Sequence, residues 1–348
     1  MNKALTLIFI FIASIAIAQQ DPYYTHFKDI PQAFNPAAAG HDTGEVCFSG
    51  LTHHQWRDFE DHTKIRGSEG DLSLIAEDVA PVTYNLNVGS MWTLDKAKTK
   101  FLGTGLTIVD DKIGYTKGTT VMANINYKMD FQGGFSQLSI GAGVGVTQWG
   151  YDKPQFKFRQ ANDPNIPTAG QKDGQLDVNF GVFYKMNNFS IFKDFYAGLS
   201  VTNLNGATYN VPTNTGTIDI DFVPHYYALA GGDYDLGNGI VLEPAVLAKY
   251  ALIGGEFRPQ FDLNVTALYA QSLRGGAAYR QWGNADAVSL LIGYIPKDNL
   301  EIGYSYDVTL SNIQKVSNGT HEIMVKYCIP IVTRPPTPPI IRLTPRFL

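Results

Sequence analysis

The chain has 348 residues, of which 44% are hydrophobic, 12% are aromatic and only 17% are charged. Soluble domains average about 25% charged residues, so charge is scarce in this chain. The formal net charge of -5 offers no basic surface for nucleic acid, and no nucleic-acid partner is expected. The mean hydropathy of -0.10 and the lack of a long apolar run after the N-terminal region argue against a bundle of transmembrane helices. A soluble β-sandwich and a transmembrane β-barrel remain.

Residues 1–18 have the three parts of a secretory signal peptide. They combine a basic start, an apolar stretch over 4–12 and a small-residue cleavage site, Ala-Ile-Ala at 16–18. A single anchoring helix is the alternative, but the apolar stretch is short for a membrane span. We expect cleavage before Gln19 and a mature chain outside the cytoplasm, with residues 19–43 as an N-terminal periplasmic segment.

Apolar and polar residues then alternate with a period of two over residues 44–328. At residues 300–311, for example, Leu300, Ile302 and Tyr304 alternate with small or polar residues. In a strand, these two sets face opposite sides. The alternating segments predict strands near 44–56, 66–76, 101–111, 117–129, 135–148, 175–187, 194–204, 223–235, 238–250, 257–271, 273–283, 285–296, 298–311 and 319–328.

The length of these strands favours a barrel. A sandwich uses strands of about 5 to 6 residues, whereas a tilted strand that crosses a bilayer needs about 9 to 11 residues with one apolar face. Aromatic residues near strand ends, such as Tyr226, Tyr227 and Tyr250, suit the two bilayer interfaces. The sequence therefore predicts an all-β fold, a transmembrane antiparallel β-barrel of about 14 strands over residues 44–328.

The connections predict the orientation of this barrel. Outer-membrane barrels have short periplasmic turns and longer external loops. The short connections at 130–134, 236–239 and 296–299 are therefore expected in the periplasm, and the long ones at 149–174 and 205–222 outside. We expect a location in the bacterial outer membrane, with both termini periplasmic.

Residues 77–100 do not fit this scheme, because they would form a long periplasmic connection. The stretch 85–92 inside it is, alternatively, a further strand or an inward hairpin. The expected number of strands therefore has a margin of about two.

No motif points to an enzyme, and no cofactor is expected. The glycine-rich stretch 141–146 lies in an alternating strand without a following helix, so we interpret its glycines as small inward residues that let a plug or loop approach the wall. The segment 53–62 gathers three histidines and three carboxylates, a composition that can bind metal. Because adjacent His53 and His54 face opposite sides of a strand, we expect a solvated polar loop and no metal site.

The two cysteines, Cys47 and Cys328, lie near the two ends of the predicted barrel. The alternation turns both towards the lumen, and the first and last strands of a closed barrel are neighbours. We expect the two cysteines to lie close together at the periplasmic rim, either as a disulfide or as two unrelated small lumen residues.

Residues 329–348 form a Pro-rich C-terminal extension. Its prolines exclude a strand or a helix and favour an extended arm. Because its Ile, Val and Leu residues are too apolar for a solvated spacer, we hypothesise that this arm docks a periplasmic partner. A disordered tail is the alternative.

Several short strings, in this order and spacing, resemble one family. They are Asn35-Pro36, Gln55-Trp56, Asp110-Asp111-Lys112 with Gly114, Tyr304 and Tyr306 with Asp307, and His321-Glu322. Together they make the chain similar to the PorP/SprF family of type IX secretion system outer-membrane proteins, over nearly the whole mature chain to about residue 328. The strings carry no catalytic residues, so the resemblance implies structural or partner-contact roles.

The resemblance implies an outer-membrane barrel that works with the type IX secretion and gliding machinery. Its partners would be a large secreted surface protein with a type IX C-terminal domain, often an adhesin, a periplasmic peptidoglycan-associated lipoprotein or motor component, and outer-membrane lipid. The barrel would help export or anchor the surface protein, with outer loops near 57–65, 149–174, 205–222 and 312–318 as grips. A segment of the partner or of the chain itself would occupy the lumen. The alternative is a diffusion porin or hydrophobic-solute channel.

Overall fold

The computed structural model describes residues 21–40, 45–59, 63–66, 72–75, 79–131, 133–151, 170, 172–213, 215–253, 256–281 and 287–331. The predicted signal peptide and nearly all of the Pro-rich extension lie outside these residues. Within the described residues, no helix has the length and apolar character that a membrane span requires.

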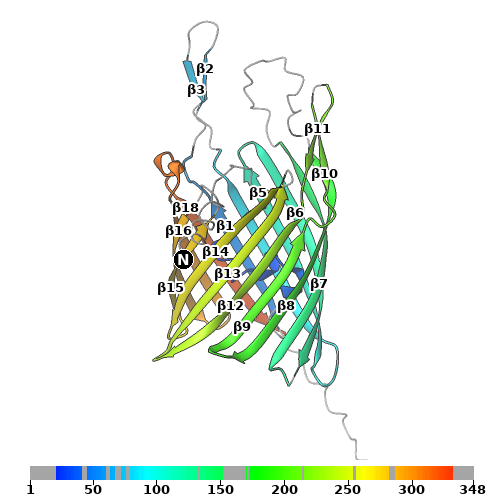
Figure 1. Cartoon of the computed structure of the whole chain (residues 1–348), viewed down its shortest axis with the longest axis vertical. Coiled ribbons are helices and arrows are strands. Elements are labelled where there is room, and N and C mark those ends of the chain that lie inside the picture. The colour runs from blue at the N-terminus through cyan, green and yellow to red at the C-terminus, as the bar shows by residue number, and fades with distance from the viewer. Residues whose placement is uncertain are drawn as a thin grey trace, which may run out of the picture.

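Fourteen strands form a closed antiparallel barrel (Figure 1). Each strand pairs with its neighbours along the wall, and β1 pairs with both β4 and β18, which closes the barrel. The wall strands are β1 (Glu45–His54), β4 (Val82–Thr93), β5 (Lys100–Ile113), β6 (Thr116–Phe131), β7 (Ser136–Tyr151), β8 (Lys172–Phe189), β9 (Phe192–Thr202), β12 (His225–Gly237), β13 (Ile240–Ile253), β14 (Glu256–Tyr269), β15 (Leu273–Gln281), β16 (Ala287–Lys297), β17 (Leu300–Thr309) and β18 (Thr320–Pro330). The predicted antiparallel barrel is thus confirmed.

One predicted wall strand was wrong. Residues 66–76 do not form a wall strand; β2 (Thr63–Arg66) and β3 (Leu72–Ile75) form a separate hairpin that projects beyond the barrel (Figure 1). At four residues each, they are too short to cross a bilayer. The second wall strand is β4, so residues 77–100 are not a long periplasmic connection, and the further strand that we considered there is the correct reading.

A second hairpin lies in the predicted loop 205–222. Its strands, β10 (Thr208–Pro212) and β11 (Thr217–Asp221), pair with each other in a two-stranded sheet of their own, and Tyr209 of β10 packs against Trp149 of β7. This hairpin and β2–β3 rise from the same end of the barrel (Figure 1). A short 3-10 helix, η3 (Asn312–Lys315), lies in the connection between β17 and β18.

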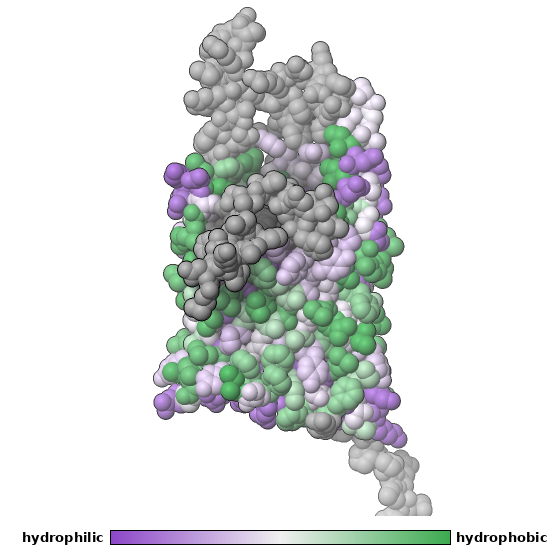
Figure 2. Space-filling model, viewed as in Figure 1, coloured by the Kyte–Doolittle hydropathy of each residue, from purple (hydrophilic) through white to green (hydrophobic). Residues whose placement is uncertain are grey.

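The wall has an apolar outer face and a polar inner face. On β6, Val121 and Ile125 are exposed, whereas Asn124, Asn126 and Lys128 between and beside them are buried inside the barrel. Figure 2 shows apolar residues over much of the wall and hydrophilic residues gathered at the lower rim. This division follows from the period of two, because successive side chains in a strand point to opposite faces. An apolar outer surface is what a barrel presents to lipid.

The two ends of the barrel differ. One end, the short-turn end, carries tight connections at 94–99, 132–135, 190–191, 238–239, 270–272 and 298–299, together with the start of β1 and the end of β18. The other end, the long-loop end, carries the connections between β1 and β4, β7 and β8, β9 and β12, and β17 and β18.

Residues 21–40, which the sequence led us to assign to a periplasmic segment, instead lie inside the barrel, and we call them the plug. The plug contains two 3-10 helices, η1 (Pro31–Ala33) and η2 (Pro36–Ala38). Its side chains Phe27, Ile30 and Phe34 are buried in one apolar cluster with inner-wall residues. Burying these apolar groups is favourable, which explains why the segment stays inside rather than in water. The lumen is therefore filled by the chain itself, one of the two occupants that we considered.

Candidate functional site

Glu322 of β18 is the central contact between the plug and the wall. Its carboxylate is fully buried and accepts hydrogen bonds from the backbone N–H groups of Thr25 (2.9 Å) and His26 (2.7 Å). Oε2 of Glu322 also lies 2.7 Å from Nδ1 of His53 on β1. Hydrogen bonds to a carboxylate are shorter and stronger than neutral ones. One wall residue thus holds two consecutive backbone N–H groups of the plug.

Arg280 of β15 forms a second contact to the same part of the plug. Its guanidinium donates to Asp262 (2.7 Å) and to Asp307 (2.9 Å), and also to the Thr25 hydroxyl (3.1 Å). The ring of Tyr23 lies 3.9 Å from the guanidinium carbon. A buried charge is tolerated when it is paired and hydrogen-bonded, and Arg280 meets both conditions.

A second group of charges holds the middle of the plug. Lys28 lies 2.5 Å from Glu243 of β13, and Arg274 of β15 lies 2.8 Å from the same carboxylate. Arg274 also contacts Glu301 and Asp29. Burial alone would raise the pKa of Asp29, but Lys28 and Arg274, with a hydrogen bond from His26, hold that pKa well below its ordinary value. Asp29 is therefore a charged member of this network.

The start of the plug is held by Asp21. Its carboxylate accepts hydrogen bonds from Tyr227 (2.7 Å) and Thr202 (3.2 Å) and lies 3.6 Å from His225, while its backbone carbonyl accepts from Lys249 (2.9 Å). Burial acts to raise the pKa of Asp21, but these neighbours together lower it to about 2. The carboxylate is therefore ionised at neutral pH.

Asn35 and Pro36, the first family-like string, lie at the far end of the plug. The side chain of Asn35 caps η2 by accepting from the N–H of Ala37 (2.9 Å), and donates to wall carbonyls of Val182 (3.0 Å) and Leu199 (3.3 Å). Pro36 occupies the first position of η2, where its fixed φ and missing N–H cost nothing.

Glycines in the wall make room for this end of the plug. A Cβ on Gly141 would lie 2.7 Å from Ala37, and one on Gly181 would lie 2.1 Å from Oδ1 of Asn35. The interpretation of Gly141 as a small residue that lets a plug approach is confirmed. Gly143 and Gly145 instead adjoin Asn124 and Met122 of the neighbouring strand.

Other family-like residues gather at the long-loop end. Gln55 is buried, the N–H of Trp56 donates to Thr320 (3.1 Å), and Gly114 takes a positive φ of 58° in the turn after β5. Asp110 faces outward and pairs with Lys117 at 3.0 Å. Lys112 lies near the end of the same strand, opposite Lys117 in register. These positions shape turns and the rim.

Tyr304, Tyr306 and His321 form a small group on the outer face of β17 and β18. The Tyr304 hydroxyl lies 2.8 Å from Nδ1 of His321, and the Tyr306 ring centre lies 5.1 Å from that of His321. The neighbours of these residues in sequence, Asp307 and Glu322, face inward to the plug. The alternation of the strand thus splits one sequence string between two faces.

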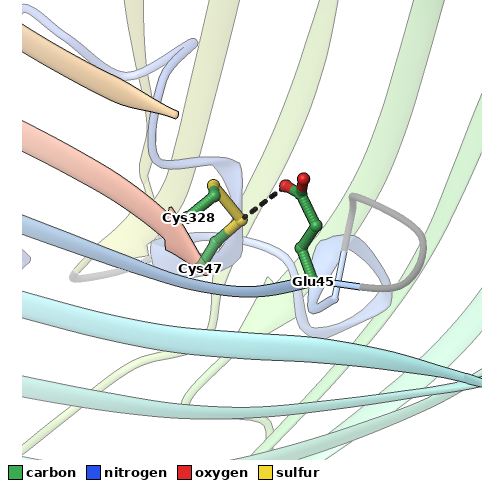
Figure 3. Close-up of side chains that lie close together, drawn as sticks. All are labelled: Glu45, Cys47 and Cys328. Carbon is green, nitrogen blue, oxygen red and sulfur yellow. Dashed lines mark hydrogen bonds between the residues drawn. A yellow bond between two sulfur atoms is a disulfide. The ribbon is translucent and has the colours of Figure 1, made fainter. Parts of the chain in front are cut away.

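Cys47 and Cys328 are register partners on β1 and β18 and form a disulfide, with Cα atoms 4.0 Å apart (Figure 3). The bond lies at the short-turn end, and Oε2 of Glu45 lies 3.9 Å from the sulfur of Cys47. Among the described residues, only these three bring potential metal ligands together. Because a thiolate is the ligand, the oxidised pair is not suited to hold an ion.

The segment 53–62 separates as its alternation predicted. His53 points inward to Glu322, and His54 points outward, with its ring centre 6.1 Å from that of Tyr84. Residues 60–62 lie outside the described residues.

A cavity of about 440 Å³ lies between the plug and the inner faces of β5 to β8. Its lining includes Ile113, Thr116 and Tyr151, at strand ends, so it reaches the long-loop end. Ile220 and Phe222, from the β10–β11 hairpin and the residue after it, line it as well. Its volume is in the range of small-molecule binding sites, about 300 to 1,000 Å³.

Apart from Asp307 and Glu322, the charged wall residues that hold the plug were missed from the sequence. Arg280, Asp262 and Glu243 sit at inward positions of predicted strands, and an inward charge in a charge-poor chain was a usable signal. The residues that they contact could not be predicted from the sequence, because those contacts depend on where the plug lies in the barrel.

The apolar outer face, polar inner face and closed antiparallel sheet define an outer-membrane β-barrel whose lumen holds residues 21–40 of the same chain. The sequence matches the family described as type IX secretion system membrane protein PorP/SprF over residues 16–327, and the chain belongs to this family. It is therefore an outer-membrane barrel of the type IX secretion system. No curated protein matches the sequence significantly.

Several solved structures are similar to this chain, and the first of them shares its fold. A Pseudomonas aeruginosa FadL homologue superposes with a TM-score of 0.50 at 11% identity, over 85% of this chain and 93% of that chain. The P. putida toluene transporter TodX gives 0.47 at 10% identity, over 84% and 92%. The translocator domain of autotransporter NalP from Neisseria meningitidis gives 0.40 at 11%, over 87% and 95%. At these identities the likeness concerns the fold alone.

Proposed function

We propose that this barrel helps export or anchors a large secreted surface protein, such as an adhesin, through the C-terminal domain of that protein. The observation that supports this proposal is the plug. Its backbone and side chains are bonded to the wall by Glu322, Arg280 and Glu243, which suits a barrel that binds and orients a partner better than one that lets solutes diffuse. We propose that the barrel acts by binding rather than by catalysis. Its proposed role in gliding would be to hold the surface protein.

The proposed orientation puts the short-turn end, with the end of β18, in the periplasm. The start of the plug does not fit the expected periplasmic N-terminus, because Asp21 lies inside the barrel beside Thr202 and His225, at the long-loop end. The long-loop end, with hairpins β2–β3 and β10–β11, then faces outward and meets the surface protein. The Pro-rich extension is proposed to meet a peptidoglycan-associated lipoprotein or motor component. Single cysteines placed at Gly133 and at Ser317, in a variant without Cys47 and Cys328, test the orientation. A membrane-impermeant thiol reagent on whole cells should label only position 317.

Co-purification tests the function. The full chain, extracted from outer membranes in mild detergent, should bring a large surface protein with it, and a variant lacking residues 332–348 should lose only periplasmic partners. In a planar bilayer, the purified barrel alone should conduct little. Steady conductance by the wild-type protein without any co-purifying surface protein would support the alternative, a diffusion porin or hydrophobic-solute channel.

A further inference from the structure

The cavity at the long-loop end contains acidic groups that take no part in holding the plug. Asp111 of β5 and Asp177 of β8 both line it. Asp111 accepts a hydrogen bond from Thr83 (2.5 Å). Neither carboxylate has an ion-pair partner among the described residues, whereas Asp21, the third acidic residue in the lining, lies beside His225.

Asp177 is the most informative of these groups. It is 94% buried, since its relative exposure is 6%, and its Oδ1 atom has no hydrogen-bond partner within the part of the chain that the structure describes. A buried carboxylate oxygen without a donor is costly. A ligand in the cavity that donates hydrogen bonds would remove this cost.

The remaining lining indicates the charge of that ligand. Lysine, arginine and histidine are all missing from the described lining of the cavity, so nothing there would attract an anion. Aromatic rings, including Trp149, Phe222 and Tyr227, line it as well. The faces of such rings attract ammonium and guanidinium groups.

A metal ion fits this cavity poorly. Calcium and magnesium need several oxygen ligands that converge within bonding distance. Asp111 and Asp177 are not among the described residues whose ligand atoms gather closely enough to share an ion. On the wall, Asp177 stands in register with Gly145, Met122 and Thr107, whereas Asp111 stands four residues further along β5. Separated acids among rings suit an extended organic cation.

We propose that this cavity binds an organic cation, an ammonium or guanidinium group, with Asp177 as its main hydrogen-bond acceptor. Under the proposed function, the group is a lysine or arginine side chain of the surface protein that enters from the long-loop end. That source of the cation rests on the proposed function. The preference for a cation rests only on the cavity.

Calorimetry on the purified full-length barrel in detergent tests the proposal. The probes are a blocked glycyl-lysyl-glycine tripeptide, the same peptide with an acetylated lysine side chain, and spermidine. The lysyl peptide should bind and the acetylated peptide should not. Asp177→Asn should weaken binding by roughly tenfold or more, the loss expected for a charged hydrogen bond. Asp233→Asn, with the same charge change on an inward residue outside the cavity, should bind like the wild type.

Equal binding of the charged and acetylated peptides, or no binding of any cation, overturns the proposal, as does unchanged affinity in Asp177→Asn. Should Asp177→Asn fail to fold, Asp111→Asn takes its place. Tighter binding of the lysyl peptide than of spermidine identifies a polypeptide source, and the reverse identifies a free amine. If the barrel binds the peptide but co-purifies with no surface protein, the cation site is supported and the proposed function is not. If the surface protein co-purifies but no peptide binds, the proposed function is supported and the cation site is overturned.

Discussion

Glu322, on the last strand, accepts hydrogen bonds from two consecutive backbone N–H groups of the plug, those of Thr25 and His26, nearly 300 residues earlier in the chain. The last strand of the barrel is thus also the main anchor of the segment that precedes the first strand. This carboxylate is therefore one of the links that couple assembly of the wall to docking of the plug.

We predict that Glu322→Ala loosens the plug. The substitution leaves two buried N–H groups and His53 without their acceptor, and breaking a buried charged contact costs about 3 to 5 kcal/mol. The plug should become sensitive to protease, and conductance in a planar bilayer should rise. Glu45→Ala, at the rim and outside the contacts of the plug, is the control. Identical protease patterns for both variants would contradict the prediction.

We predict that Gly181→Ala displaces the end of the plug that carries Asn35. The added Cβ would lie 2.1 Å from Oδ1 of Asn35, so the amide must leave its two wall carbonyls and the cap of η2. Each lost hydrogen bond costs about 1 kcal/mol or more. Gly50→Ala, where a Cβ meets open space, should behave like the wild type in protease protection. Equal protection of the two variants would count against this packing.

The hold on Asp21 predicts a response to acid. Its pKa falls from 3.8 to about 2 on folding. A carboxyl whose pKa is lower in the folded state stabilises that state above the pKa of the free group, and this contribution, about 2 kcal/mol, is lost as the pH falls through the folded pKa. Pepsin cleavage after the plug aromatics should therefore increase between about pH 4 and pH 2. Asp21→Asn should cleave readily throughout, and a wild-type pattern in that variant would refute the assignment.

The disulfide predicts a redox dependence of barrel stability. It closes a loop with a sequence separation of 281 residues, and the chain-entropy estimate for so long a loop is about 5.6 kcal/mol. Reduction should lower the urea concentration at the midpoint of unfolding, which is measured from the mobility of the protein on a gel. The double variant Cys47→Ala with Cys328→Ala should show the low midpoint with or without reductant. A reductant effect of equal size in that variant would mean that the disulfide is not its cause.

The wall was predictable because its physics is local. A period of two, strand length and turn spacing are properties of neighbouring residues, and they placed most strands and both cysteines correctly. The exception was the second strand, which the sequence led us to place at 66–76, with 85–92 as an alternative; the structure places it at Val82–Thr93. Only pairing with β1 and β5 along its full length distinguishes β4 as the wall strand.

The plug was not predictable in the same way. Residues 21–40 have no period, contain several prolines and follow a predicted signal peptide, so the sequence favoured a segment in the aqueous periplasm. Its place depends on contacts with residues such as Glu243, Arg280 and Glu322, which lie more than 200 positions away. The cavity depends in turn on the plug, and for the same reason Asp177 could not be singled out.

The disulfide between Cys47 and Cys328 joins the first and last strands, so residues 47–328 form a covalently closed loop. The plug precedes Cys47 in the sequence and is therefore not part of this loop, although it lies inside the barrel. Because the plug is attached to the closed loop at one end only, it can leave the lumen and return without breaking a covalent bond or opening the wall. Under the proposed function, a partner segment that replaced the plug in the lumen would leave the wall closed, because the disulfide keeps β1 and β18 joined at their seam.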